Sequence, residues 1–185
     1  MVKKVAVGVA VLGLLACAAE GREGLERRLK ALLPSPKELP GWSYVKGTYV
    51  FCPTPKSLTK IYDGGYEAYT KRGAVAALSL IYQRKKPKGI MTIIIHSTKG
   101  TAQSKALYAW LKGQAGRRAK PKPVSVAKRA IGCVLPIPGG HAGYGYYGTI
   151  MVSISATGER TEADVLRALK AILGKAVPKR KGKRR

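Results

Sequence analysis

The sequence predicts an α+β domain in which three helices pack against an antiparallel sheet of about five strands, two hairpins plus an N-terminal strand. Three observations support this prediction. Apolar, β-branched runs occur in two pairs, and a short turn joins each pair. Three other stretches space their apolar residues as a helix does. A chain of 185 residues, less a leader, suits one domain with a substantial core.

The first expected strand and helix follow each other closely. Aromatic and β-branched residues cluster at residues 42–51, ahead of two prolines, and predict a strand. Residues 57–71 have helical spacing, with Ser57 as a candidate cap and Gly64 and Gly65 in the interior. Each interior glycine destabilises a helix by about 1 kcal/mol relative to alanine, so we expect another segment to approach closely there.

Two hairpins and two more helices complete the expected domain. The helices begin at Thr101 and Thr161, and Thr161 with Asp164 resembles a capping box. The first hairpin turns through a basic, proline-containing segment, and the second turns through a Pro-Gly-Gly segment. The hairpin strands are expected at residues 74–83 and 89–97, and at residues 124–137 and 144–155.

The first residues have the pattern of an export signal. Two lysines precede an uninterrupted apolar run at residues 5–16, which is about 12 residues long, where a membrane-spanning helix needs about 20. Residues 1–16 are therefore predicted to be a signal peptide. Leu14-Leu15-Ala16-Cys17 resembles the bacterial lipobox, which implies lipidation of Cys17 and anchoring to a membrane. Ala16 and Ala18 also fit ordinary signal cleavage, which would leave a soluble periplasmic protein.

The remaining chain divides into a tether, a domain and a tail. Residues 17–40 form the expected tether and include a short amphipathic helix, which either lies on the membrane or docks on the domain. Residues 41–177 form the single domain. Residues 178–185 have like charges and no apolar side chain except the ring of Pro178, so we expect a disordered tail. The tail cations that could contact an anion are Lys179, Arg180, Lys181, Lys183, Arg184 and Arg185.

Charge is the dominant feature of the composition. The net charge is +26, and Asp63 and Glu67 are the only carboxylates between Trp42 and Gly158. Such a surface attracts anionic envelope polymers, lipid head groups or nucleic acid, and charge alone does not choose among them. The alternative is a protein that is only soluble and weakly adhesive.

Two cysteines remain if Cys17 carries lipid. Cys52 and Cys133 allow one disulfide, which export makes plausible and which would stabilise the domain by about 4 kcal/mol on the chain-entropy model. The other interpretation is a pair of separate buried thiols, because a disulfide needs Cα atoms within about 7 Å of each other.

A short motif resembles a known family. Residues 61–69, Ile-Tyr-Asp-Gly-Gly-Tyr-Glu-Ala-Tyr, follow Leu39-Pro40-Gly41-Trp42 and precede Gly73. They resemble an uncharacterised bacterial family of exported proteins and lipoproteins, whose hallmark is similar to Tyr-Ile-Asn-Gly-Gly-Ala-Glu-Leu-Tyr. The resemblance implies architecture and location but no activity. Its matching positions are Asp63, Gly64, Gly65, Glu67 and Tyr69, while the Ile61-Tyr62 order and Tyr66 depart from the pattern.

Few residues indicate chemistry. Asp63 and Glu67 would share a helix face, where two carboxylates can share a proton or hold a cation, but salt bridges or capping give them a structural role instead. His96 and His141 have no partner at a metal-ligand spacing, so we expect neither metal nor cofactor. A cysteine and histidine pair would act in catalysis only if folding brought the two together.

The segment at residues 143–148, Gly-Tyr-Gly-Tyr-Tyr-Gly, fits G-x-G-x-x-G, but a strand rather than a helix is expected to follow it. Tyr144 and Tyr146 also resemble the base-stacking aromatics of an RNA-recognition strand, or else they pack under a helix. The expected function is a non-enzymatic envelope lipoprotein that binds or scaffolds through its basic surface. The alternatives are a nucleic-acid-binding module that uses Tyr144, Tyr146 and the basic tail, and an exported hydrolase that uses Asp63 and Glu67.

Overall fold

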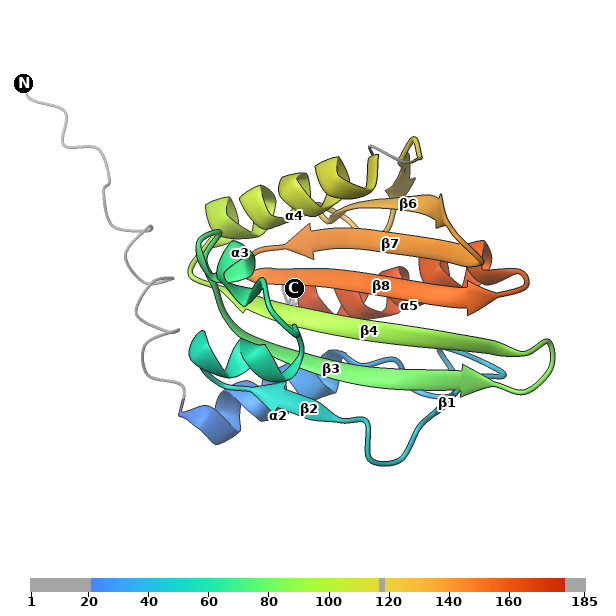
Figure 1. Cartoon of the computed structure of the whole chain (residues 1–185), viewed down its shortest axis with the longest axis horizontal. Coiled ribbons are helices and arrows are strands. Elements are labelled where there is room, and N and C mark those ends of the chain that lie inside the picture. Colours follow the sequence, from blue (N-terminus) through green and yellow to red (C-terminus); the bar gives the residue numbers. More distant parts are fainter. Residues whose placement is uncertain (1–20, 117–118, 179–185) are drawn as a thin grey trace, which may run out of the picture.

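An eight-stranded antiparallel sheet lies at the centre of the molecule (Figure 1). The computed structural model describes residues 21–116 and 119–178. The strands are β1 (Ser43–Tyr44), β2 (Val50–Cys52), β3 (Ala74–Arg84), β4 (Gly89–Thr98), β5 (Lys122–Ser125), β6 (Ile131–Ile137), β7 (Gly140–Tyr147) and β8 (Ile150–Gly158). Their order is β1-β3-β4-β8-β7-β6-β5, and β2 also pairs with β3.

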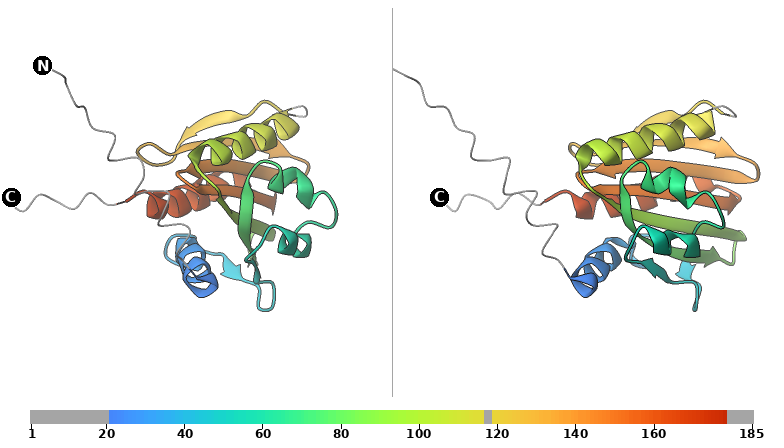
Figure 2. Two further views of the ribbon diagram at one scale, coloured as in Figure 1. Left: turned by 90° about the vertical axis from the view of Figure 1, so that its left-hand side faces the viewer. Right: turned by 60° about the vertical axis from the view of Figure 1, so that its left-hand side comes forward.

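Helices cover both faces of this sheet (Figure 2). Helices α2 (Arg22–Leu32) and α5 (Thr161–Ala176) lie on one face, where their leucines join the larger hydrophobic core. The 3₁₀ helix η1 (Lys56–Lys60) and helices α3 (Tyr66–Thr70) and α4 (Thr101–Gly116) lie on the other face, over a second core. Both faces of the sheet therefore carry apolar side chains.

The predicted count of about five strands and three helices is wrong: the described chain has eight strands and four α-helices. The first expected strand is split into β1 and β2, because Gly47 turns the chain at a φ of +83°. Residues 124–137 are split into β5 and β6 near Arg129, which has a φ of +70°. Residues 144–155 contain a hairpin between β7 and β8 that turns at Gly148. The expected first hairpin is present as β3 and β4.

The expected helix at residues 57–71 is also interrupted. Gly64 and Gly65 adopt φ values of +75° and +73°, which end the helical path between η1 and α3. A Cβ atom at either glycine would meet no heavy atom within 4 Å. The glycines are therefore needed for a left-handed turn, and the close approach expected there is absent.

Strand β7 explains how α5 seats on the sheet. Its glycines face α5, where a Cβ atom at Gly143 would lie 2.5 Å from Val165 Cγ1 and one at Gly145 would lie 2.6 Å from Leu173 Cδ1. Side chains alternate between faces along a strand, so Tyr144 and Tyr146, which alternate with these glycines, point to the opposite face. The glycines of the Gly-Tyr repeat thus allow α5 to pack closely on one face of the sheet, and the tyrosines place aromatic rings on the other face.

Helix α2, which was expected within the tether, docks on the domain. Leu29 and Leu32 are buried in the core that α5 forms with the sheet. The Tyr49 hydroxyl donates a hydrogen bond to Glu26 Oε1 at 2.7 Å. Lys175 of α5 donates to the Leu33 carbonyl at 2.8 Å. Of the two alternatives for this helix, docking is the one observed.

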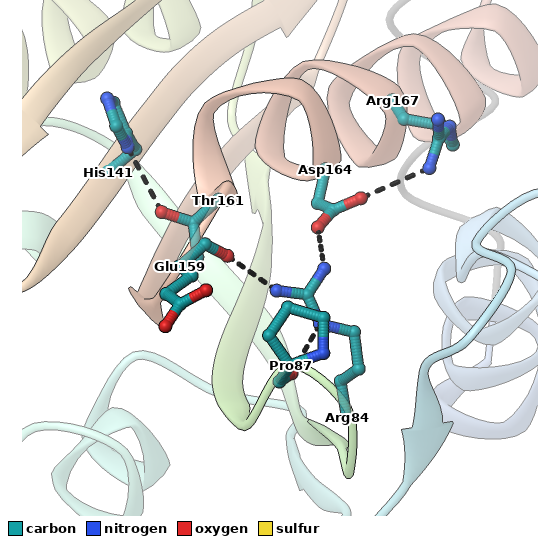
Figure 3. Close-up of polar contacts among 7 residues, drawn as sticks. All are labelled: Arg84, Pro87, His141, Glu159, Thr161, Asp164 and Arg167. Carbon is teal, nitrogen blue, oxygen red and sulfur yellow. Dashed lines mark hydrogen bonds and ion pairs between the residues drawn. The ribbon is translucent and has the colours of Figure 1, made fainter.

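Arg84 joins the end of β3 to the start of α5 (Figure 3). Its guanidinium forms an ion pair with Asp164, and both side chains are about nine-tenths buried, at 10% and 8% exposure. The guanidinium also donates to the carbonyls of Glu159 at 2.5 Å and Pro87 at 2.8 Å. Trp42 lies against it, with the ring centroid 4.8 Å away. This cluster fixes the β3–β4 hairpin against the helix.

The expected capping box of Thr161 and Asp164 is not formed. Helix α5 begins after Arg160, which has a φ of +54°, and no side chain caps it. The Thr161 hydroxyl instead forms a hydrogen bond with His141 Nδ1 at 3.0 Å. Asp164 is taken up by Arg84 and by Arg167 at 3.1 Å (Figure 3). Asp164 therefore forms a buried ion pair with Arg84 and does not cap the helix.

Candidate functional site

Helix α4 lies across the tyrosines of β7 and creates a groove on each of its flanks. Leu107 and Leu111 bury the underside of the helix. The Ser104 hydroxyl holds its first turn through a hydrogen bond of 2.7 Å to the Thr98 hydroxyl. The rings of Tyr108 and Tyr146 meet with centroids 5.3 Å apart. The helix therefore rests on an aromatic floor, and both flanks remain open.

The first groove, named the lysine groove here, lies between α4 and strand β6 and has a volume of about 680 Å³. Tyr108 and Tyr146 form its floor, and Ile131 lines it with 47% of its surface exposed. Lys105 and Lys112 of α4 complete its lining. The arrangement combines an apolar surface with two cations.

The cations of the lysine groove have no acidic neighbour in sequence. No Asp or Glu occurs between Ala68 and Gly158, the stretch that builds α4 and strands β3 to β8. Among the described residues, no ion pair includes Lys105 or Lys112. The two lysines are two helical turns apart on one side of α4, a rise of about 10 Å. The groove can therefore offer its positive charge to a ligand.

Cys133 lies beneath the lysine groove. Burial raises the pKa of its thiol, while a hydrogen bond with Tyr108 and the charge of Lys112 act in the opposite direction. Burial also raises the pKa of the Tyr108 hydroxyl. Both groups are thus held in their neutral forms near pH 7, and the floor adds no negative charge to oppose a bound anion.

The second groove lies along the other flank of α4, and most of its lining side chains are apolar. It also measures about 680 Å³ and is lined by Leu111 and Ala115 of the helix, by Ile137 at the end of β6 and the following Pro138, and by Tyr144. Among its described lining residues, Gln114 is the one amide and none is charged, whereas Lys105 and Lys112 line the lysine groove.

The motif at residues 61–69 packs over a buried histidine. The Tyr62 hydroxyl lies 2.5 Å from His96 Nε2, and the Tyr69 ring stacks on Tyr62 with centroids 3.8 Å apart. Burial lowers the pKa of His96 to about 4, and an interaction with the Met151 main chain offsets only part of that effect. Burial also raises the pKa of Tyr62, so the tyrosine is the hydrogen-bond donor. The aromatic positions of the motif enclose a neutral histidine.

The carboxylates of the motif are not brought together in a cleft. Asp63 lies in the turn before α3 and Glu67 lies on α3, and both are exposed. Neither lines one of the two grooves, and neither belongs to an ion pair of the described residues. The sequence predicted that Asp63 and Glu67 share a helix face. They do not, because Asp63 lies outside α3.

Cys52 and Cys133 are separate, buried, free thiols. Cys52 lies on β2, which pairs with β3, and four strands (β3, β4, β8 and β7) separate β2 from β6, which carries Cys133. Neighbouring strands are about 4.8 Å apart, so this separation greatly exceeds the reach of a disulfide. Of the two interpretations left open by the sequence, the structure has the separate thiols.

The tyrosines of β7 are not free to stack on bases. Tyr146 is 8% exposed and Tyr144 is partly buried, and both join the core beneath α4. Gly148 lies at the turn of the β7–β8 hairpin, so a strand follows the G-x-G-x-x-G segment, as predicted. Cys17 and the six tail cations predicted to contact anions lie outside the described residues.

Among the described residues, no group of three or more His, Cys, Asp or Glu side chains is placed to hold a metal ion. Within residues 21–116 and 119–178, no helix has the length and apolar character needed to cross a bilayer.

The sequence alone does not single out the residues of the lysine groove. Lys105 and Lys112 are two of many lysines, and Ile131 lies within one of the expected strands. One available signal was the seven-residue spacing of the two lysines, with Tyr108 between them on the same side of a helix.

Comparison with known proteins shows the fold alone. No protein-family model matches the chain, and no curated protein sequence matches it. The structure is similar to the extracellular domain of PknH from Mycobacterium tuberculosis, with a TM-score of 0.52 over 82% of this chain and 96% of that one. The two sequences are 15% identical.

Proposed function

We propose that this protein is a non-enzymatic, exported domain that binds anionic partners of the cell envelope through its basic surface. The observation that carries the proposal is the acid-free stretch between Ala68 and Gly158, which builds most of the sheet and both grooves. The signal-like residues 1–16 support export, and the similar PknH structure is an extracellular domain. Asp63 and Glu67 line neither groove, so the proposal assigns no hydrolytic role to them.

The proposal includes a lipid anchor at Cys17, because the cysteine directly follows the apolar run of the signal. Acyl chains contribute about 0.8 kcal/mol per buried methylene, so a multiply acylated protein stays on the membrane. In cells fed labelled palmitate, the label is expected in the wild-type protein and not in Cys17→Ser. A Cys17→Ser protein that still partitions with membranes as the wild type does would contradict the anchor.

Anionic lipid head groups and envelope polymers are the proposed partners. The Cys17→Ser protein, which removes the contribution of an anchor, is expected to bind vesicles that contain phosphatidylglycerol and to leave pure phosphatidylcholine vesicles free. Binding is expected to fall at least tenfold when NaCl rises from about 50 mM to about 500 mM, because salt screens exposed charges. Co-sedimentation measures this directly.

A truncation after Pro178 serves as the variant for the basic tail. It is expected to weaken vesicle binding, because each Lys or Arg near an anionic surface contributes about 1 kcal/mol. Binding that is unchanged by salt would overturn the charge-driven account. Much tighter binding to duplex DNA than to vesicles at the same salt would favour the nucleic-acid alternative instead.

A further inference from the structure

We infer that the lysine groove binds a single-chain anionic amphiphile of the fatty-acid type. The carboxylate pairs with Lys112, and the alkyl chain lies over Tyr108, Tyr146 and Ile131. The inference deepens the proposed function, because it assigns one ligand class to one place on the basic surface.

The apolar part of the groove explains an otherwise unfavourable exposure. Ile131 is 47% exposed although it lies in strand β6 of the sheet. Pro121, Ala109 and the two tyrosine rings surround the same space, so the exposed isoleucine belongs to a continuous apolar lining. An alkyl chain placed there would remove this surface from water, which favours binding in proportion to the apolar area that is covered.

The charged part of the groove selects the head group. Lys112 is half-buried in the groove lining, and its charge offsets part of the rise that burial causes in the pKa of the Cys133 thiol, so the ammonium acts near the floor. The aliphatic stem of a lysine can follow an apolar wall while its ammonium meets a polar group. With no carboxylate between Ala68 and Gly158, a ligand carboxylate meets no acidic competitor from these elements.

The shape of the groove favours a linear ligand. Its helical wall runs from Lys105 to Gly113 of α4, and the eight steps between these residues correspond to a length of about 12 Å. The volume of about 680 Å³ lies within the range of about 300–1,000 Å³ that is usual for small-molecule sites. An extended alkyl chain fits this length, with the carboxylate near one lysine.

Titration calorimetry of the Cys17→Ser protein with laurate tests the inference. Laurate is expected to bind at least tenfold more tightly than dodecyltrimethylammonium, which has the same chain length and the opposite charge, and more tightly than acetate, which lacks the chain. Lys112→Met is expected to weaken laurate binding at least tenfold, since it removes a charge-assisted contact and keeps the stem. Ala109→Glu, an exposed change in the helical wall, should also weaken it by repulsion.

Lys170→Met is the matched control, because Lys170 is an exposed lysine on α5 at the opposite face of the sheet. It should leave laurate affinity unchanged. Circular dichroism establishes that each variant is folded. Equal laurate affinity in Lys112→Met, Ala109→Glu and the parent protein would overturn the groove assignment, as would equal binding of the cationic detergent. If the groove assignment failed but vesicle binding stayed sensitive to salt, the proposed function would stand, and only the assignment of the ligand to the lysine groove would be rejected.

Discussion

Replacing Asp164 with alanine is expected to lower the free energy of unfolding by about 3 kcal/mol. Arg84 and Asp164 are an ion pair about nine-tenths removed from solvent, and the pair joins the β3–β4 hairpin to α5. Loss of the carboxylate leaves the Arg84 guanidinium buried with only carbonyl partners and the Trp42 ring. Urea denaturation followed by circular dichroism measures the change.

Glu162→Ala is the control for this prediction. Glu162 is on the same helix but is 49% exposed, and its partners are Lys122 at 3.3 Å and His141 at 3.6 Å, which are 68% and 26% exposed. Exposed pairs contribute about 0–1 kcal/mol, so this variant should unfold close to the wild type. If Asp164→Ala lost no more stability than Glu162→Ala, the Arg84 cluster would not be what fixes the β3–β4 hairpin against α5.

The second large effect is a loss of stability in mild acid. His96 is fully buried, and its pKa falls from an ordinary value of 6.5 to about 4 in the folded protein. Between these values the unfolded chain binds more protons than the folded one, so stability is complete above pH 6.5 and decreases as the pH falls. At 1.36 kcal/mol per pKa unit, the loss contributed by this residue between pH 7 and pH 4 is about 3 kcal/mol.

His96→Gln separates this effect from the titration of carboxylates. A glutamine stays neutral and can accept the hydrogen bond of Tyr62, so the variant is expected to lose most of the pH dependence between pH 6.5 and 4. His141→Gln, at a partly exposed histidine, should retain it. The same pH dependence in His96→Gln and in the wild type would rule out His96 as the source.

The order of elements in the fold was more predictable than their number. The β3–β4 hairpin and helices α4 and α5 appear where apolar periodicity predicts them, because long periodic segments are dominated by burial. The errors lie at single residues that take a left-handed conformation. Gly47, Gly148 and Arg129 each divide an apolar run that looks continuous in sequence, and Arg129 has no side-chain feature that would signal a turn.

The candidate site was less predictable, because it depends on contacts between distant elements. The lysine groove combines Lys112 of α4 with Ile131 of β6, and nothing in either segment alone shows that they meet. Asp63 and Glu67 attracted attention because acids are rare in this chain, yet the left-handed Gly64 and Gly65 place both carboxylates in solvent. Charge composition favours an anionic partner, which stays a prediction, and packing was needed to locate the candidate groove.

The most direct test of the account is a set of NMR amide shifts for the Cys17→Ser protein during titration with laurate. The account predicts saturable shifts along one flank of α4, from Lys105 to Gly113, and at Ile131 and Tyr146, with little change in α5. Shifts confined to other parts of the surface, such as the basic β3–β4 turn at residues 85–88, would contradict it.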